Sequence, residues 1–276
     1  MSLITFDNTG DKKFEAGVDH CVLYPLTNGA YNHGVAWNGI TGITESPEGG
    51  DAQDFYADNI KYGSLRGAEN FGGTIECYTY PDEWKGCDGR ADLADGVTFS
   101  QQSRKIFGLS YRTLIGSDTM ELGAGYILHI IYGCTASPSS KSRSTVNESP
   151  EAGTMSYEFK TTPVNVSKIA NAKATSHIEI DSTKVSSKVL AAIEAALYGK
   201  NGVVSYSPAS PSGSENPASE GWYERSGSEG SYVYTLTTDN SVQSSKTYYI
   251  KNEVGGANAY LPTPDQLYDL IASAQS

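Results

Sequence analysis

The chain has 276 residues and a formal net charge of −12, with 20 Lys and Arg against 32 Asp and Glu. Affinity for nucleic acid depends on clustered basic residues, so this charge balance argues against nucleic-acid binding as the main task. The composition includes 19 Tyr and 29 Gly, which favours short strands and tight turns. At this length the chain can hold one large β domain, alone or with a smaller module.

The sequence predicts neither an export signal nor a membrane-spanning segment. Residues 1–17 contain no basic segment followed by an apolar core, and no run approaches the roughly 20 apolar residues of a membrane span. We therefore expect synthesis in the cytoplasm. Four cysteines are too few and too scattered for a disulfide framework, although Cys77 and Cys87 could approach each other across a loop. Reduced, partly buried thiols are expected at Cys21, Cys77, Cys87 and Cys134.

The N-terminal third predicts short strands separated by turns. Strand patterns occupy residues 21–24 and 34–37. Residues 40–50 are rich in turn-forming residues, so we expect an extended surface loop that continues neither strand. From Gly73 apolar and polar side chains alternate until Pro81, which predicts a half-buried strand.

The strongest sheet signal lies in the middle of the chain. Residues 107–115 and 126–132 each repeat apolar side chains at period two, and their Gly- and Asp-containing connector suits an antiparallel hairpin. Further strands are predicted at 155–159 and 175–180, separated from the hairpin by the polar run 137–153.

Two helices are predicted. Residues 186–198 carry an apolar stripe, and Gly199 suits the C-terminal cap, so this helix should lie against a sheet face. Near the C-terminus, Thr263, Pro264 and Gln266 form the pattern of a capped helix start.

The segment between these helices changes in composition. Residues 206–221 are almost wholly Ser, Pro, Gly, Glu and Ala, and three short aromatic strand patterns follow. We therefore interpret residues 203–256 as a small β module inserted into a loop of a main domain formed by 1–202 and 257–276. Its faces should point outward.

The histidines do not predict a catalytic or metal site. No two of His20, His33, His129 and His177 share a metal-ligand spacing. His129 alternates outward from its apolar neighbours, which favours a surface or interface role. His20 adjoins Cys21, but neighbours in a strand point to opposite faces, so a nucleophile with its base is not expected.

The acidic residues give no better candidate. Asp88, Asp92 and Asp95 resemble a calcium loop only loosely, and solvated loop acids are the favoured interpretation. A glycosidase could use Glu83 paired with Glu76 or with Asp82. Any acidic β protein offers such carboxylate pairs, so they are not specific evidence for an enzyme. The glycines of 67–73 lack the spacing of a phosphate cradle. We therefore expect no enzyme, and no catalytic, cofactor-binding or metal-binding residues.

Several segments carry a resemblance to a known family. They are FYADNIKY (55–62), GGTIECYTYPDEW (72–84), RKIFGLSYRT (104–113), LHIIYG (128–133), NESPE (147–151), FKTTPV (159–164) and IDST (180–183). In this order they closely resemble the major tail proteins, or tail tube proteins, of long-tailed, siphovirus-like bacteriophages. The resemblance runs from about residue 37 to 202 and resumes at 261–265.

The resemblance implies a mainly β subunit, a β-sandwich or β-barrel with a flanking helix at about 186–198 and long loops. Such subunits assemble with themselves into rings, usually of six, stacked into a tube through which genomic DNA leaves the virion. Other tail proteins would bind the tube ends, and assembly would take place in the host bacterial cytoplasm. The net negative charge accords with a lumen through which DNA slides without specific binding. The inserted module departs from the family pattern and is expected on the tube exterior.

Long loops are the expected contacts between subunits. The candidate residues are Glu45, Ser46, Pro47, Glu48, Asp54, Phe55, Tyr56, Asp58, Asn147 and Glu148. An alternative function is a surface adhesin or carbohydrate-binding β module, suggested by the Tyr content and the segment around Trp222. A metal-independent glycosidase is a third alternative.

Overall fold

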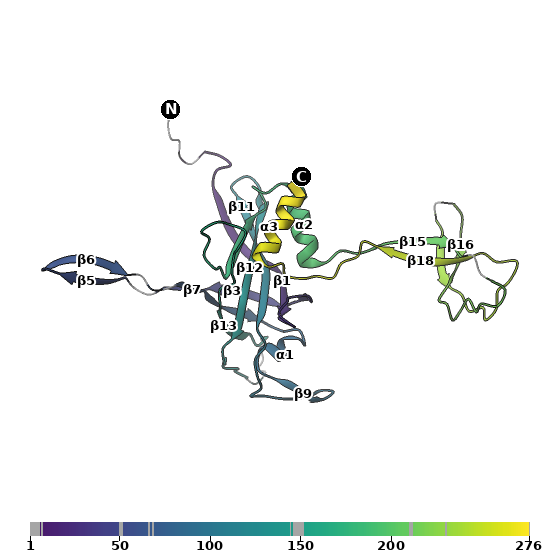
Figure 1. Ribbon diagram of the computed structural model, residues 1–276, viewed down its shortest axis with the longest axis horizontal. Helices are drawn as coiled ribbons and strands as arrows, with labels where there is room; N and C mark the ends of the chain where they lie inside the picture. The colour runs from purple at the N-terminus through teal and green to yellow at the C-terminus, as the bar shows by residue number, and fades with distance from the viewer. Residues whose placement is uncertain are drawn as a thin grey trace. The chain divides into compact units, whose positions relative to one another are not determined.

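The computed structural model describes residues 6, 8–49, 52–65, 67, 69–143, 145, 152–209, 212–229 and 231–275. In these residues the chain is a mainly β protein with one large antiparallel sheet, small extra sheets and three short helices (Figure 1). It divides into two compact units, Met1–Tyr198 with Asn258–Ser276, and Gly199–Ala257. The ends of the second unit are joined by a bridge between Lys200 and Ala257.

The elements of the first unit, in chain order, are β1 (Lys13–Pro25), β2 (Val35–Ala36), β3 (Ile40–Glu45), β4 (Glu48–Gly49), β5 (Gln53–Ala57), β6 (Ile60–Leu65), β7 (Glu69–Asn70), β8 (Gly72–Cys77), α1 (Trp84–Cys87), β9 (Ala91–Ala94), β10 (Val97–Phe99), β11 (Phe107–Ser117), β12 (Glu121–Ala136), β13 (Met155–Thr161), β14 (His177–Asp181), α2 (Ser187–Tyr198) and α3 (Pro264–Gln275). The second unit contains β15 (Val203–Pro208), β16 (Tyr223–Ser226), β17 (Val233–Leu236) and β18 (Tyr248–Val254).

The large sheet is built around the predicted central hairpin, which the structure confirms as β11 and β12. Its strand order is β2-β1-β11-β12-β13-β8-β3, and β14 also pairs with β12. β12 can serve so many neighbours because it is long: residues 127–131 pair with β14, and residues 134–136 pair with β13. Near the two ends of this order β1 and β3 contact each other, so the sheet curls.

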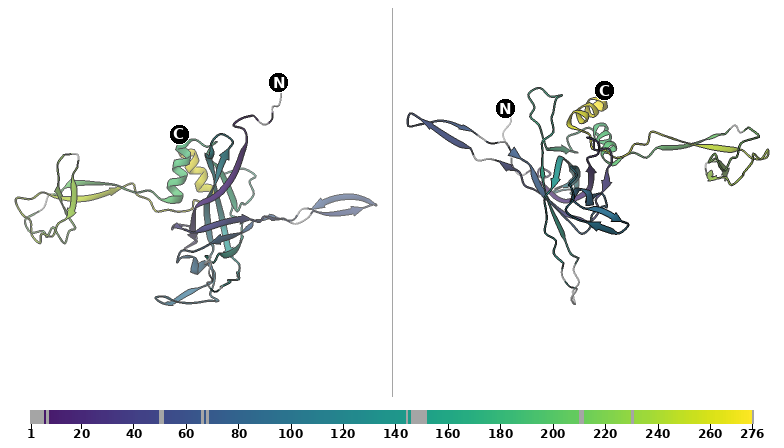
Figure 2. Two further views of the ribbon diagram at one scale, coloured as in Figure 1. Left: turned by 180° about the vertical axis from the view of Figure 1, so that it is seen from behind. Right: turned by 60° about the horizontal axis from the view of Figure 1, so that its bottom comes forward.

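Each face of the sheet has its own hydrophobic core, because side chains alternate along a strand. The tryptophan core contains Trp37 and Trp84 together with Leu109 of β11 and Ile131 of β12. The helix-side core contains alternate residues of β12 and the apolar stripes of α2 and α3. The two helices lie side by side against this face (Figures 1 and 2).

A bulge at Gly133 places Cys134 and Ala136 of β12 in the tryptophan core together with Ile131. Leu109 pairs with Ile131 and Phe107 with Cys134, so β12 has one extra residue here. Gly133 has a φ of +62°, and a Cβ at this position would lie 2.1 Å from the carbonyl oxygen of Thr162. Only glycine fits this bulge.

Both predicted helices are confirmed, with their caps. α2 ends at Tyr198 and is followed by Gly199, whose φ is +78°. α3 begins with a capping box: the Thr263 hydroxyl accepts from the Gln266 N–H, and the Gln266 side chain accepts from the Thr263 N–H.

The prediction of a surface loop at residues 40–50 was wrong. Residues 40–45 form β3, which pairs with β8 through Ile40 with Cys77 and Ile43 with Ile75. Gly42 marks a register shift in this pairing, so the turn-forming composition reflects an irregular strand. The sheet partner overrides the local preference.

The second unit is a four-stranded sheet with the order β15-β18-β16-β17. Trp222 and Tyr248 are buried in it. The ring of Tyr206 stacks on that of Tyr234 at 3.9 Å between centroids. Asp239 accepts from the Tyr248 hydroxyl at 2.7 Å and pairs with Lys246 at 2.9 Å, which fixes the loop between β17 and β18.

Candidate assembly surface

The predicted contact residues belong mostly to one segment, residues 46–71, which we name the arm. Glu45 ends β3, and Ser46 and Pro47 are the first residues of the arm. The remaining positions are Glu48 in β4, Asp54, Phe55 and Tyr56 in β5, and Asp58 in the turn after β5. Asn147 and Glu148 lie outside the described residues.

The arm ends in a hairpin of β5 and β6 with a two-residue turn. Ala57 pairs with Ile60, and the turn residues Asp58 and Asn59 have φ values of 51° and 63°. Positive φ at both positions is the type I′ geometry that matches the twist of a hairpin, and Asp and Asn tolerate it. The sequence therefore specifies this hairpin locally.

The hairpin exposes apolar side chains that its own sheet does not cover. Tyr56, Ile60, Tyr62 and Leu65 are 68%, 64%, 72% and 67% exposed. Among the described residues, β5 and β6 pair only with each other (Figure 1). A single two-stranded hairpin is marginally stable in water, and exposed apolar groups of this kind mark interaction surfaces.

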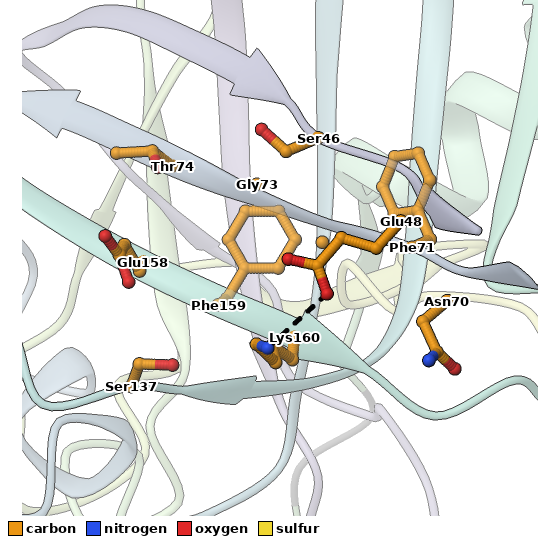
Figure 3. A pocket seen from close by; sticks show the side chains of 11 residues that line it. Ser46, Glu48, Asn70, Phe71, Gly73, Thr74, Ser137, Glu158, Phe159 and Lys160 are labelled. Atoms are coloured by element: carbon orange, nitrogen blue, oxygen red, sulfur yellow. Dashed lines mark ion pairs between the residues drawn. The ribbon is translucent and has the colours of Figure 1, made fainter. Parts of the chain in front are cut away.

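A shallow hollow lies at the root of the arm, where the chain leaves β3 and returns into β8 (Figure 3). The rings of Phe71 and Phe159 and the ion pair of Glu48 with Lys160, at 3.6 Å, surround it (Figure 3). Its volume of about 200 Å³ is below the range of about 300–1,000 Å³ usual for small-molecule sites. The hollow suits a side chain better than a free ligand.

A second cluster brings together residues that sequence reasoning kept apart. Glu45 of β3, His129 of β12 and His177 of β14 converge in the curled sheet. Nδ1 of His129 lies 3.3 Å from Nε2 of His177 and 3.4 Å from Oε1 of Glu45, and these last two atoms are 3.8 Å apart. The Tyr111 hydroxyl donates a hydrogen bond to the same Glu45 oxygen.

The prediction of an outward-facing His129 was wrong, since this residue is only 5% exposed. His129 does lie on the opposite face of β12 from Leu128 and Ile130, but the curled sheet covers that face as well. Burial lowers the pKa of His129, partly offset by the Glu45 carboxylate, so the imidazole is neutral near pH 7. The pairing of β14 with β12, which no local pattern reveals, brings His177 beside it.

The other candidates for chemistry are structural. Cys21 is buried, and burial raises the pKa of its thiol far above the usual range, so it is a poor nucleophile. His20 is exposed on the opposite side and contacts Arg112, which also holds Asp19 at 2.9 Å. All four cysteines are free and buried, more deeply than expected.

The interpretation of Asp88 as a solvated acid was wrong. Its side chain is 8% exposed and forms ion pairs with Arg90 at 3.0 Å and Lys141 at 2.9 Å. Asp82, by contrast, is an exposed partner of Lys85. Glu76 is exposed on β8.

None of the helices in the described part of the chain combines the length and apolar character needed to cross a membrane. No known protein-family model matches the chain, and no curated protein matches it.

Proposed function

We propose that this protein is a structural subunit that assembles with copies of itself into stacked rings, forming the tail tube of a long-tailed bacteriophage. The curled main sheet would be the β-sandwich or β-barrel of the tube wall. The proposal includes a virion location, other tail proteins at the tube ends and passage of genomic DNA without specific binding. It assigns the protein no enzymatic activity.

The arm hairpin carries this proposal. The register places Phe55, Ile60 and Leu65, which are 43%, 64% and 67% exposed, on one face, and Tyr56, which is 68% exposed, on the other. Burying both faces requires surfaces that the described chain does not supply. A neighbouring copy in a ring, or in the next ring, would supply them.

A second exposed hairpin supports the same proposal. β9 and β10 pair with each other, and Leu93, Val97 and Phe99 are 74%, 49% and 42% exposed. Closed rings need two different patches on each subunit, because a head-to-tail interface joins unlike surfaces. The two hairpins offer unlike patches.

The test is the assembly state of the purified full chain. We expect rings or tubes by negative-stain electron microscopy, and a mass by light scattering that grows with protein concentration. A protein that stays monomeric at every concentration, with no rings in micrographs, would overturn the proposal.

One observation favours a second candidate, a carbohydrate-binding or adhesin role for the second unit. Tyr206, Tyr223 and Tyr234 gather in half-buried ring contacts, and Arg225 lies over the exposed ring of Tyr232 at 4.2 Å. Tyrosine offers an apolar ring and a polar hydroxyl for recognition. Binding on a glycan array by a protein that forms no rings would favour this candidate.

A further inference from the structure

We propose that Glu45, His129 and His177 form a binding site for one divalent transition-metal ion of the zinc class. The site lies within the first unit and does not depend on the proposed function. It departs from the expectation, drawn from sequence spacing, that the chain has no metal ligands.

The distances between the donor atoms fit a tetrahedral ion. Zn²⁺ binds nitrogen and oxygen ligands at about 2.0–2.1 Å, so two ligands of a tetrahedral site lie about 3.3–3.4 Å apart. The three separations here are 3.3, 3.4 and 3.8 Å. Two imidazoles and one carboxylate form a ligand set that zinc sites with an open fourth position use.

Hydrogen bonds around the cluster keep Nδ1 of His129 unprotonated, so that it accepts from Nε2 of His177, a contact that a bound ion would replace. The Thr113 hydroxyl donates to Oε2 of Glu15 at 3.2 Å, so its oxygen accepts from the other side. Nε2 of His129 lies 3.0 Å from that oxygen and must therefore carry the proton. A histidine held by an acceptor on its other nitrogen is the usual arrangement of a metal ligand.

The two imidazole rings also face each other through the nitrogens that would bind the ion. Their planes are within 7° of parallel, with centroids 5.5 Å apart and the nearest nitrogens 3.3 Å apart. The distance between the centroids is longer than the distance between the nitrogens by about two ring radii. The two nitrogens therefore face each other along the line that joins the ring centres. The rings therefore lie edge to edge in nearly one plane. An ion bound to both nitrogens would lie beside that line, and each ring would turn toward it on binding.

Charge and access suit a cation. Glu45 places a carboxylate oxygen 3.4 Å from Nδ1 of His129, and its negative charge would offset the charge of the ion. Tyr111 donates to the Glu45 oxygen that would bind the ion and so holds that carboxylate in place. The side chains of His129, His177 and Glu45 are 6%, 15% and 30% exposed, so an ion can enter from the Glu45 side and keep one water.

The donor set also selects the metal class. Imidazole nitrogen suits Zn²⁺, Cu²⁺ and Ni²⁺, whereas Mg²⁺ and Ca²⁺ prefer oxygen alone. Such an ion would tie β3 to β12 and β14 beside the root of the arm, where Phe71 packs on the ring of His177 at 4.8 Å. The arm would then leave the sheet from a fixed point.

The experiment titrates the untagged full-length protein, stripped with a chelator, with Zn²⁺ by calorimetry and with Co²⁺ by visible absorption. We expect one ion per chain and a tetrahedral cobalt spectrum. The substitutions His177→Ala and Glu45→Gln should each weaken Zn²⁺ binding at least tenfold. The matched control is His33→Ala, because His33 is exposed and lies outside the cluster; it should bind Zn²⁺ like the wild type.

A measurement without mutation guards against variants that fold poorly. Zn²⁺ should raise the unfolding temperature of the wild type, and excess chelator should reverse the rise, since a ligand of the folded state stabilises it. The proposal is overturned if the wild type binds no Zn²⁺, if cobalt is octahedral, or if both cluster variants bind Zn²⁺ as tightly as His33→Ala. None of these outcomes decides whether the protein forms rings, which is tested separately.

Discussion

The hairpins β11–β12 and β5–β6 obey the same local rules and end in opposite environments. Both are antiparallel, and both carry apolar side chains on their two faces. Ile130 of β12 is fully buried, whereas Ile60 of β6 is 64% exposed. The rest of the chain covers β11–β12 with the tryptophan core on one face and the helix-side core on the other.

The difference shows that a strand with apolar residues on both faces needs two covers. α2 and α3 supply one cover for β12, and β3, β8 and β13 with α1 supply the other. Nothing in the described residues does this for β5 and β6. Variants of the two hairpins should therefore separate stability of the fold from contact with a partner.

The largest expected effect is on the covered hairpin. Ile130→Ala removes a fully buried side chain from the helix-side core. We expect the free energy of unfolding to fall by about 2–5 kcal/mol, because a buried cavity adds to the lost transfer energy. Denaturant unfolding measures this, and the exposed Ile169→Ala serves as the control, with Ile169 53% exposed. A loss under about 0.5 kcal/mol, the range of surface substitutions, would mean that Ile130 is not covered.

The hairpins also show what the sequence could predict. The β11–β12 hairpin follows from period-two patterns on either side of a Gly- and Asp-containing connector, and α2 and α3 follow from their stripes and caps. Strand β3 could not be found this way, because only its pairing with β8 outweighs the turn-forming residues around Gly42. The resemblance predicts contact residues in the arm, but it does not predict the pairing of β5 with β6, which depends on the turn at Asp58 and Asn59.

The cluster of Glu45, His129 and His177 was beyond sequence reasoning for a related reason. Its members come from three strands, and they meet only because β14 pairs with β12 and the sheet curls toward β3. Alternation correctly separates His129 from Leu128. Alternation does not say whether the face on which His129 lies meets solvent or a second core.

The next effect concerns the turn of the exposed hairpin. Asn59→Val places a β-branched residue at a φ of 63°, which costs roughly 1–2 kcal/mol. Because β5–β6 has little else to hold it, we expect its amide hydrogens to exchange faster while those of β11–β12 keep their protection. Asn59→Gly should leave exchange in β5–β6 nearly unchanged. Equal exchange in the valine and glycine variants would contradict the type I′ turn.

A smaller effect concerns the turn that leads from β14 to α2 and so helps to cover β12. Hydrogen bonds from Thr183, aided by Lys184, lower the pKa of Asp181 to about 2. A carboxyl whose folded pKa lies below its unfolded value stabilises the fold above the unfolded pKa, and this stabilisation is lost as the pH falls through the folded pKa. Asp181→Asn should cost about 1 kcal/mol at pH 7, and the difference from wild type should shrink between pH 4 and pH 2. A difference that does not change with pH would contradict this assignment.

The smallest effect on stability is expected at Ile60, and it is the sharpest test of the comparison. Ile60→Ala is the same substitution as Ile130→Ala, but at an exposed position it should change the free energy of unfolding by less than about 0.5 kcal/mol. If the arm is an assembly surface, the variant should nevertheless need a higher protein concentration to form rings, as measured by light scattering, whereas Ile169→Ala assembles like the wild type. Unchanged assembly of Ile60→Ala combined with Tyr62→Ser would mean that neighbouring copies do not cover the hairpin, and that its apolar faces serve another contact.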